Sequence, residues 1–525
     1  MAQRGLERLV AWGGWPALAS GSLALGLYLT TAAPSLTWAH DSADGGELLA
    51  AAQTLGIAHP PGYPAYLLLL HLWTRLPLGS DLARRGNAFS ALGGALAVAL
   101  FASLLTRCLR REGSARPRLT AFLGGLLAAA MPTLWGQATV TEVYTLHALF
   151  FVAFWSLLWR ADGARRALLW LAGAGLVAGV GLGNHLSLAL ALPGAVAWLL
   201  WRREGRGRAL GALAGGLLLG LLVYLYLPLR ARAWPPVNWG NPQTWAGFRW
   251  LVSGELYRPF VFGLSGAYLL PRLGAWAALL REQFGWVGLA LGWMGLWAEG
   301  NRGCWRRLAF LGSAFALYTA YALGYDTTDS YVYLLPAHFA FAWWAVQGLS
   351  ALAPASAKGL LDGVQPSAAR AVHWGAIALL GASVGLGVVG AFPRMDLRGD
   401  GEAWRYGREV LSEAPPRALV LVVGDRQVFA LWYFRYGEGE RPDVAVVTPN
   451  LWPYGWYRET VQHTHPDLEP DGGPLPEDLG ALVREALAAG RPVVATEEAV
   501  RDAAALRAYR PLRRAGTPLY DLRQP

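Results

Sequence analysis

Long apolar runs separated by short polar segments fill the chain from residue 12 to about residue 391. Runs of this kind cross a bilayer as helices, since a crossing takes about 20 apolar residues. The pattern therefore predicts a polytopic α-helical membrane protein with about 11 transmembrane helices. The expected spans are 12–33, 87–106, 119–136, 140–159, 167–183, 185–201, 209–228, 284–298, 308–324, 331–352 and 372–391.

Clusters of arginine between these runs predict the orientation, because Lys and Arg are retained in cytoplasmic loops. Arg4 and Arg8 precede the first run, which we interpret as an uncleaved helix that leads outward rather than as a signal peptide. The next strongly basic loop, residues 107–118, must then be cytoplasmic. Only one crossing can separate it from residue 34, so most of the intervening chain is expected outside.

The resulting first external loop covers residues 34–86 and contains two further helical patterns. Residues 44–56 alternate polar and apolar positions at helical spacing, which predicts an amphipathic helix on the surface. Residues 64–79 form a shorter apolar run that we interpret as interfacial or re-entrant. A second long external loop is expected over 229–283.

The remaining residues, 392–525, have the composition of a soluble domain, distinct from the transmembrane domain of residues 1–391. Buried strands are predicted at 418–424, 443–448 and 492–496, with a helix between the first two. Strand, helix and strand in this order indicate a small α/β domain with parallel strands, placed outside by the last span. Gly424-Asp425 follows the first strand without a glycine-rich phosphate loop, so a packing or acceptor-docking role is favoured over nucleotide binding.

Composition adds two restrictions. The chain is 54% hydrophobic and 15% charged, and its net charge of +10 is divided among short clusters between apolar runs, which argues against nucleic-acid binding. The two cysteines, Cys108 and Cys304, fall in arginine-rich loops expected in the cytoplasm, so no disulfide is predicted.

Polar residues between the spans collect on the predicted external side. Because ionisable groups near a bilayer are costly and tend to mark sites, their convergence predicts a cavity at the outer leaflet. They include His40, Asp41, Asp44, Glu47, His59, Gln137, Glu142, Tyr144, His147, Asn184, His185, Arg230, Arg232, Asp326 and Asp329.

This set suits a transferase that moves a sugar from a lipid-phosphate carrier. Such an enzyme needs a base for the acceptor hydroxyl, which Asp44 or Asp41 would supply. It needs donors for the departing phosphate, which Arg230 and Arg232 would supply. Inversion at the anomeric carbon requires one carboxylate base and no covalent intermediate.

Several motifs resemble the protein O-mannosyltransferase-like family of membrane proteins. The most specific is Asp44-Gly-Gly-Glu47-Leu followed by Leu55-Gly-Ile-Ala-His59-Pro-Pro-Gly-Tyr63-Pro. Further matches are Trp135-Gly-Gln-Ala-Thr-Val-Thr-Glu142-Val-Tyr144-Thr-Leu, Gly181-Leu-Gly-Asn184-His185, Leu225-Tyr-Leu-Pro-Leu-Arg230, Val237-Asn-Trp-Gly-Asn-Pro242, and Asp326-Thr-Thr-Asp329-Ser-Tyr331 with Leu335-Pro336.

The resemblance implies a GT-C glycosyltransferase fold, a catalytic aspartate in the first external loop and a polyprenyl-phosphate sugar donor. The family motif reads Asp-Ser-Gly-Glu or similar, whereas residues 44–47 read Asp-Gly-Gly-Glu. Asp41 nearby leaves the identity of the base open, with Asp44 favoured. The candidate catalytic residues are Asp44, Asp41 and Glu47, and the candidate substrate-binding residues are His59, Tyr63, Glu142, Tyr144, Asn184, His185, Arg230, Arg232, Asp326 and Asp329.

Ordinary structural roles compete with each assignment. Asp44 and Glu47 could begin a helix, and Asp41 could cap one. His59 before two prolines could fix a turn, Tyr63 could anchor at the interface, and the two arginines could pair with lipid head groups. Asn184 and His185 could cap helix ends. Carboxylates and histidines can bind a divalent ion, but no tight ligand spacing occurs, so we expect no metal and no cofactor beyond the lipid-linked sugar.

The leading hypothesis is thus a multi-pass glycosyltransferase of the plasma or inner membrane, with its N-terminus in the cytoplasm and its active site and C-terminal domain outside. It would transfer a sugar such as mannose from a polyprenyl-phosphate donor to an external acceptor hydroxyl, for example on protein Ser or Thr. Transfer to a lipid or cell-wall glycan is the variant within this class. A transporter or flippase would need charges at mid-span and repeated broken helices, which the sequence scarcely offers. A non-catalytic assembly protein is the third alternative.

Overall fold

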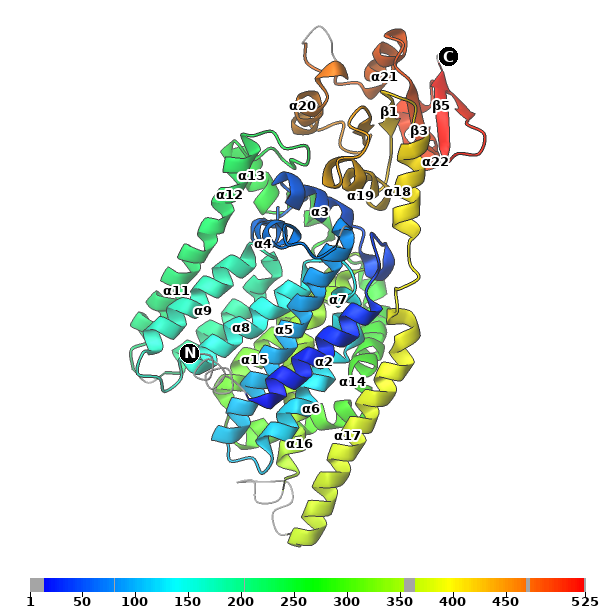
Figure 1. Cartoon of the computed structure of the whole chain (residues 1–525). Coiled ribbons are helices and arrows are strands. Elements are labelled where there is room, and N and C mark those ends of the chain that lie inside the picture. The colour runs from blue at the N-terminus through cyan, green and yellow to red at the C-terminus, as the bar shows by residue number, and fades with distance from the viewer. Residues whose placement is uncertain (1–13, 80, 203, 354–363, 469–472, 524–525) are drawn as a thin grey trace.

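A computed structural model describes residues 14–79, 81–202, 204–353, 364–468 and 473–523. Figure 1 shows an elongated body of helices, with a smaller unit of helices and strands at one end. We refer to residues 402–523 as the C-terminal unit. The predicted cytoplasmic residues Arg4, Arg8 and Arg203 lie outside the described residues.

Long helices coincide with the predicted apolar runs. Several begin at a proline in the first turn, where the missing N–H costs no hydrogen bond and the fixed φ suits a helix. The main helices of the body are α2 (Trp15–Thr31), α5 (Leu82–Arg111), α6 (Pro117–Ala129), α8 (Tyr144–Arg160), α9 (Ala167–Leu182), α10 (Leu192–Leu200), α11 (Arg206–Leu221), α14 (Leu269–Asn301), α15 (Trp305–Gly324), α16 (Leu335–Ala351) and α17 (Pro366–Met395).

Three helical stretches of the described chain are long and apolar enough to cross a membrane: Leu82–Arg111, Arg206–Ala231 and Pro366–Met395. A fourth would be the pair Pro117–Ala129 and Pro132–Ala138, which is bent by 65° at its break. The remaining helices of the body are too short or not apolar enough to be counted as crossings by their length and composition. The count of about 11 crossings therefore stays a prediction.

Breaks interrupt several predicted spans on the side toward the C-terminal unit. Short helices there are α7 (Pro132–Ala138), η2 (Leu186–Ala191), η3 (Leu222–Leu225), α12 (Tyr226–Ala231), α13 (Trp245–Val252), η4 (Glu255–Phe260), η5 (Gly266–Tyr268) and η6 (Ser330–Leu334). These breaks bring the polar connections of different helices to one end of the body.

The first external loop forms η1 (Ala39–Asp41), α3 (Gly45–Thr54) and α4 (Pro64–Thr74), and ends where α5 begins. The expected surface position of the 44–56 helix is wrong, because residues 45–52 are all buried. The C-terminal unit covers α3, as Figure 1 shows. Helix α4 is also largely buried, with Leu69 and Leu72 exposed.

Close backbone contact holds α9 against α11. A Cβ at Gly175 would lie 2.0 Å from the Leu213 carbonyl oxygen, and a Cβ at Gly216 would lie 2.0 Å from that of Ala172. Small residues allow helices to approach in this way, and such contacts are typical of helix pairs in membranes.

The C-terminal unit contains a five-stranded sheet in the order β2-β1-β3-β5-β4. Strand β1 (Leu419–Leu421) pairs in parallel with β2 (Ala445–Val447) and β3 (Val493–Thr496), at the three predicted strand positions. Strands β4 (Arg510–Arg513) and β5 (Leu519–Arg523) extend the sheet in antiparallel fashion. Its helices are α18 (Glu402–Glu413), α19 (Asp425–Trp432), η7 (Tyr433–Gly437), α20 (Gly455–Thr464), η8 (Pro466–Leu468), α21 (Leu479–Ala488), α22 (Glu497–Asp502) and η9 (Ala504–Leu506).

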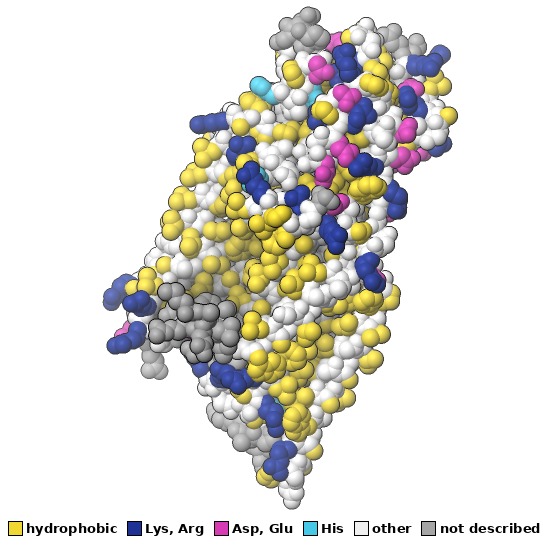
Figure 2. Space-filling view, in the orientation of Figure 1, with side chains coloured by type: hydrophobic (Ala, Val, Ile, Leu, Met, Phe, Trp, Pro, Cys, Tyr) yellow, Lys and Arg dark blue, Asp and Glu magenta, His cyan; other side chains and the backbone are white. Residues whose placement is uncertain are grey.

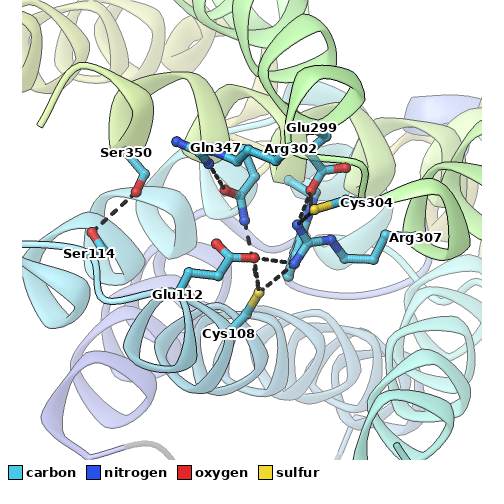
Figure 3. A network of polar contacts seen from close by, with 10 residues as sticks. Cys108, Glu112, Ser114, Glu299, Arg302, Cys304, Arg307, Gln347 and Ser350 are labelled. Carbon is cyan, nitrogen blue, oxygen red and sulfur yellow. Dashed lines mark hydrogen bonds and ion pairs between the residues drawn. The ribbon is translucent and has the colours of Figure 1, made fainter. Parts of the chain in front are cut away.

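A buried ionic cluster joins α5, α14, α15 and α16 of the body (Figure 3). Arg307 of α15 contacts Glu112 after α5, and its guanidinium lies 3.0 Å from Glu299 of α14. The Arg307 guanidinium also donates to the sulfurs of Cys108 and Cys304, each at 3.0 Å. Cys108 is buried in the last turn of α5, so its predicted place in a loop is wrong.

Charged side chains are unevenly spread over the face drawn in Figure 2. Hydrophobic side chains cover much of the helical body, basic side chains cluster toward its far end, and acidic ones concentrate on the C-terminal unit. Exposed leucines and tryptophans on α11, α14 and α17 form part of the apolar surface. An apolar flank between two polar ends is the surface that a membrane protein presents to lipid.

Candidate active site

A cavity of about 390 Å³ lies at the end of the helical body, where the first external loop meets the C-terminal unit. Its walls come from segments far apart in the sequence. The lining residues are Asp41, Ala43, Asp44, His59, Pro60, Pro61, Tyr63, Tyr144, His185, Leu186, Ser187, Ser253, Gly254, Tyr257, Phe260, Val261, Tyr321, Tyr325, Thr327, Asp329, Tyr333 and Asp425.

Asp44 and Glu47 are placed by the start of α3. Asp44 occupies the N-cap position, but its side chain makes no capping hydrogen bond and retains 33% exposure. Glu47 lies three residues later, one turn along the helix, and its side chain is fully buried. The same short helix therefore presents one accessible and one buried carboxylate.

His59 links these two carboxylates. Its backbone N–H donates to Glu47 Oε1 at 3.1 Å, and its Nδ1 contacts Glu47 Oε2. On the other side of the ring, Nε2 lies 3.5 Å from Asp44 Oδ2 and 3.1 Å from the Tyr63 hydroxyl. The turn through Pro60, Pro61 and Gly62 returns the chain so that both His59 and Tyr63 face α3.

The electrostatics of this group favour a charged histidine. Burial alone would lower the pKa of His59, but the Asp44 and Glu47 carboxylates raise it to about 10. Burial raises the pKa of Asp44 to about 6, since the opposing effect of His59 is partly offset by the nearby charges of Glu47 and Asp329. A carboxylate with this pKa is ionised at neutral pH and is a better proton acceptor than an ordinary aspartate.

Asp41 lines the same cavity but has other partners. Its Oδ2 accepts a hydrogen bond from the Tyr331 hydroxyl at 3.1 Å, and its Oδ1 lies 3.8 Å from the guanidinium of Arg426. Within the described part of the chain, Asp44 has no arginine partner of this kind. The geometry thus leaves Asp44 as the freer of the two candidate bases.

Six tyrosines line the cavity, of which the sequence identified Tyr63 and Tyr144. Tyr333 lies 5.9 Å from Tyr144 and 5.4 Å from His185, measured between ring centroids. Aromatic rings that carry hydroxyl groups offer both an apolar face and a hydrogen-bonding edge. Such walls suit a ligand that alternates C–H and O–H groups, as a sugar does. The tyrosines missed by the sequence analysis are Tyr257, Tyr321, Tyr325 and Tyr333.

Other predicted residues lie near the cavity without lining it. Glu142 and Asn184 are buried behind its wall, where the Asn184 side chain donates to the Val143 carbonyl at 3.2 Å. Asp326 is exposed and lies 3.9 Å from Arg272. His185 and Asp329 do line the cavity, as predicted.

The two predicted phosphate-binding arginines are elsewhere. Arg230 Nε donates to the Leu55 carbonyl at 2.8 Å, so its guanidinium covers the C-terminal end of α3. Arg232 is exposed at the end of α12 and does not line the cavity. Neither Lys nor Arg occurs among the described lining residues, which carry four aspartates instead.

A second groove, of about 410 Å³, shares Thr327 with the cavity. Its walls are mainly apolar side chains of α14 and α15, and Arg272 is its charged member. Arg272 donates to the carbonyls of Tyr325 and Thr327 at 2.6 and 2.9 Å and thereby fixes the connection between α15 and η6. Sequence reasoning missed Arg272, because it falls in a segment expected to be an irregular loop.

Among the described residues, no group of three or more His, Cys, Asp or Glu side chains is arranged to hold a metal ion. The cavity itself offers carboxylates, histidine side chains and tyrosine hydroxyls.

Two family models match parts of the chain, and two curated relatives are similar to it. The profile of the Protein O-mannosyl-transferase TMEM260 N-terminal domain matches residues 44–207, which begin at Asp44, and TMEM260-associated domain 2 matches residues 403–473. The Protein O-mannosyl-transferase TMEM260 of Mus musculus is 28% identical over 449 residues, covering 79% of this chain and 60% of that protein. The protein of the same name in Dictyostelium discoideum is 26% identical over 311 residues, covering 51% of this chain and 34% of that protein.

Solved structures share the fold at low sequence identity. ArnT from Cupriavidus metallidurans, bound to undecaprenyl phosphate, has a TM-score of 0.55 at 14% identity and covers 96% of this chain and 97% of its own. The archaeal oligosaccharyltransferase AglB from Archaeoglobus fulgidus, in complex with an inhibitory peptide and a dolichol-phosphate, has a TM-score of 0.52 at 12% identity, covering 97% of this chain and 74% of its own.

The chain thus shares the fold of these two solved structures, and its described part contains three helical stretches long and apolar enough to cross a membrane. The matched domains and relatives are those of protein O-mannosyl-transferases, so the matched parts of the chain are similar to that family, as the motifs around Asp44 predicted. The chain spans 60% of the length of the mouse relative.

Proposed function

We propose that the protein is a membrane glycosyltransferase that inverts a sugar on transfer from a polyprenyl-phosphate donor to an acceptor hydroxyl. The names of its relatives support mannose as the sugar and protein Ser or Thr as the acceptor. One observation carries the proposal: an accessible Asp44 carboxylate faces a tyrosine-rich cavity and is supported from behind by His59 and Glu47.

In the proposed reaction, Asp44 takes the proton of the acceptor hydroxyl. The hydroxyl oxygen attacks the anomeric carbon of the donor from the face opposite the phosphate. The bond between that carbon and the phosphate oxygen breaks, and the lipid phosphate leaves with the electron pair. One carboxylate is enough for this single displacement, since no glycosyl-enzyme intermediate forms.

His59 and Glu47 act as positioning residues in this scheme. His59 is held by Glu47 through its backbone N–H and Nδ1, so its Nε2 is fixed toward Asp44. A charged imidazole in this place keeps Asp44 ionised despite its burial. Removing Glu47 would release His59 as well as leave a buried cavity behind it.

The groove that meets the cavity at Thr327 supports the placement of the donor. Its apolar walls on α14 and α15 suit a prenyl chain, and Arg272 lies beside the shared residue. A guanidinium close to the leaving phosphate would stabilise the charge that develops on it. We assign this role to Arg272 rather than to Arg230, because Arg272 lines the apolar groove that meets the cavity, whereas Arg230 lies at the end of α3.

The distribution of charge supports an orientation in which the cavity and the C-terminal unit lie outside the cytoplasm. Basic side chains lie at the opposite end of the helical body as well as on and around the C-terminal unit (Figure 2), and basic loops between spans, such as residues 107–118, are retained inside. We therefore place the protein in the cell membrane with its N-terminus inside, and with donor and acceptor meeting at the outer surface.

Transfer by the purified full-length protein tests the proposal directly. Labelled polyprenyl-phosphate mannose and a Ser/Thr peptide should give labelled peptide. Asp44→Asn should lower the transfer rate by about 10²-fold or more, since a general base typically contributes that much. Asp41→Asn is the matched control, because it removes a neighbouring cavity carboxylate that is already paired, and it should retain most of the rate.

Thermal unfolding of both variants should stay close to that of the unaltered protein. A folded Asp44→Asn protein with an unchanged transfer rate would remove Asp44 as the base. If the unaltered protein also labels no acceptor with any of a panel of polyprenyl-phosphate sugars, glycosyl transfer itself is rejected.

A further inference from the structure

One carboxylate of the cavity comes from the C-terminal unit. Asp425 is the first residue of α19 and lines the cavity together with Asp44 and His59. Its side chain is exposed to solvent there and makes no hydrogen bond or ion pair with any residue in the described part of the chain. Its oxygens are therefore available to a ligand.

The backbone that carries Asp425 is anchored to the first external loop. The Trp38 indole N–H donates to the carbonyl of Arg426 at 3.1 Å, and the Arg426 guanidinium lies 3.8 Å from Asp41. A Cβ at Gly46 would lie 2.3 Å from the Phe429 carbonyl oxygen, so α19 rests directly on the backbone of α3. The positions of Asp425 and Asp44 are thus fixed relative to each other.

Electrostatics disfavour a free carboxylate at this place. Asp425 remains accessible, but partial desolvation by the cavity walls and the nearby charge of Asp44 raise its pKa, and His59 opposes both effects. His59 is already shared between Asp44 and Glu47. The helix dipole stabilises an acidic side chain at the start of any helix. An acid at the start of a helix away from the cavity would gain the same stabilisation without being repelled by Asp44, so the dipole alone does not explain the place of Asp425.

We propose that Asp425 is an acceptor-binding residue, which accepts a hydrogen bond from a peptide N–H beside the hydroxyl that Asp44 deprotonates. This inference rests on the proposed transfer to protein Ser or Thr. Arg272 and the apolar groove belong to the helical body, whereas Asp425 belongs to the C-terminal unit, at the start of α19 (Figure 1). The two units then form one site, with the acceptor held between them.

Kinetics of Asp425→Asn test the inference with the purified full-length protein, polyprenyl-phosphate mannose and a Ser/Thr peptide. The KM for the peptide should rise about tenfold or more, because a hydrogen bond to a charged group is lost. The KM for the donor, and the slow transfer of its sugar to water, should stay unchanged. Asp425→Ser is the second variant, since Ser also favours a helix start but lacks the carboxylate.

Glu402→Gln is the matched control. Glu402 is an exposed acid in the first turn of α18, in the same unit but away from the cavity, so its loss should leave the KM for the peptide unaltered. A peptide that is N-methylated beside its hydroxyl residue gives a second control. The methylated peptide should bind the unaltered protein more weakly than the unmethylated peptide does, by about the same factor as that by which Asp425→Asn weakens binding. The Asp425→Asn protein should bind both peptides equally.

An unchanged peptide KM in both Asp425 variants would overturn the inference, and so would a loss confined to kcat. Binding of a fluorescent peptide without donor separates this result from a failure of the proposed function. Equal binding by the unaltered protein and Asp425→Asn rejects the role of Asp425 even if no sugar is transferred. Weaker binding by the variant supports it independently of the chemistry.

Discussion

At the scale of single residues, the protonation states of three neighbouring side chains determine which group in the cavity can act as a base. His59 lies between Asp44, which is accessible, and Glu47, which is buried. Because burial raises the pKa of Asp44 to about 6, Asp44 is about 90% ionised at pH 7 and is still a stronger base than an exposed aspartate. Proton transfer benefits from a pKa close to the working pH.

The pH dependence of transfer follows from this value. Protonated Asp44 cannot accept the acceptor proton, so the rate should fall as the pH decreases through about 6 and reach a plateau above about 7. His59→Gln removes a positive charge that lowers the pKa of Asp44. The acidic limb of the profile should therefore move upward by about one pH unit or more.

Initial rates between pH 5 and 8.5, with donor and acceptor saturating, measure both profiles. His71→Gln is a suitable control, because His71 is a buried histidine of α4 that bonds a backbone carbonyl outside the cavity. The acidic limb of the pH profile of His71→Gln should lie at the same pH as that of the unaltered protein. An acidic limb that stays in place in His59→Gln would show that His59 does not set the ionisation of Asp44.

The sequence located part of this group and missed the rest for a physical reason. Asp44, His59 and Tyr63 fall within one short motif, so their types and spacing already indicated a site. Tyr257 and Asp425 reach the cavity only because distant segments fold over α3. A tyrosine in a long loop and an aspartate after a strand carry no local signal of that tertiary contact.

At the scale of elements, apolar runs predicted where the long helices lie but not how they are covered. The helical periodicity of residues 44–56 is correct for α3. Its polar positions suggested an exposed face, whereas Gly45 and Gly46 allow the backbone to be covered instead. Burial of this kind depends on a partner more than 370 residues later, which periodicity cannot reveal.

The ionic cluster around Arg307 should matter more for stability than an ion pair on the surface. Arg307→Met would leave Glu299 and Glu112 without their cation, and Glu299 is fully buried. Breaking a buried pair on one side typically costs about 3–5 kcal/mol. We expect a clear decrease in the thermal unfolding midpoint of the purified protein, since α5, α14 and α15 lose a shared contact (Figure 3).

Arg394→Met provides the comparison, because Arg394 pairs with Glu282 between two helices but is 60% exposed. Surface pairs contribute about 0–1 kcal/mol, so this variant should unfold close to the unaltered protein. Equal midpoints for Arg307→Met and the unaltered protein would indicate that the cluster is neutral in free energy, as some buried ion pairs are when repacked with apolar side chains.

At the scale of the whole molecule, the proposed chemistry depends on which side of the membrane holds the cavity. The basic loop of residues 107–118 lies at the end of the helical body far from α3 (Figure 1). If its positive residues are retained in the cytoplasm as proposed, the cavity lies outside, where the proposed donor and acceptor would meet. The sequence alone supplied this polarity, because it depends on charge along the chain and not on tertiary contacts.

Cysteine labelling in intact cells tests the orientation. Ser253→Cys puts a thiol on an exposed residue of the cavity wall, and Ala115→Cys puts one in the basic loop at the other end. A membrane-impermeant maleimide should label Ser253→Cys in intact cells and Ala115→Cys only after permeabilisation. The half-buried Cys304 of the unaltered protein reports the background at the basic end. The reverse pattern would place Asp44 in the cytoplasm, where the external transfer proposed for it could not occur.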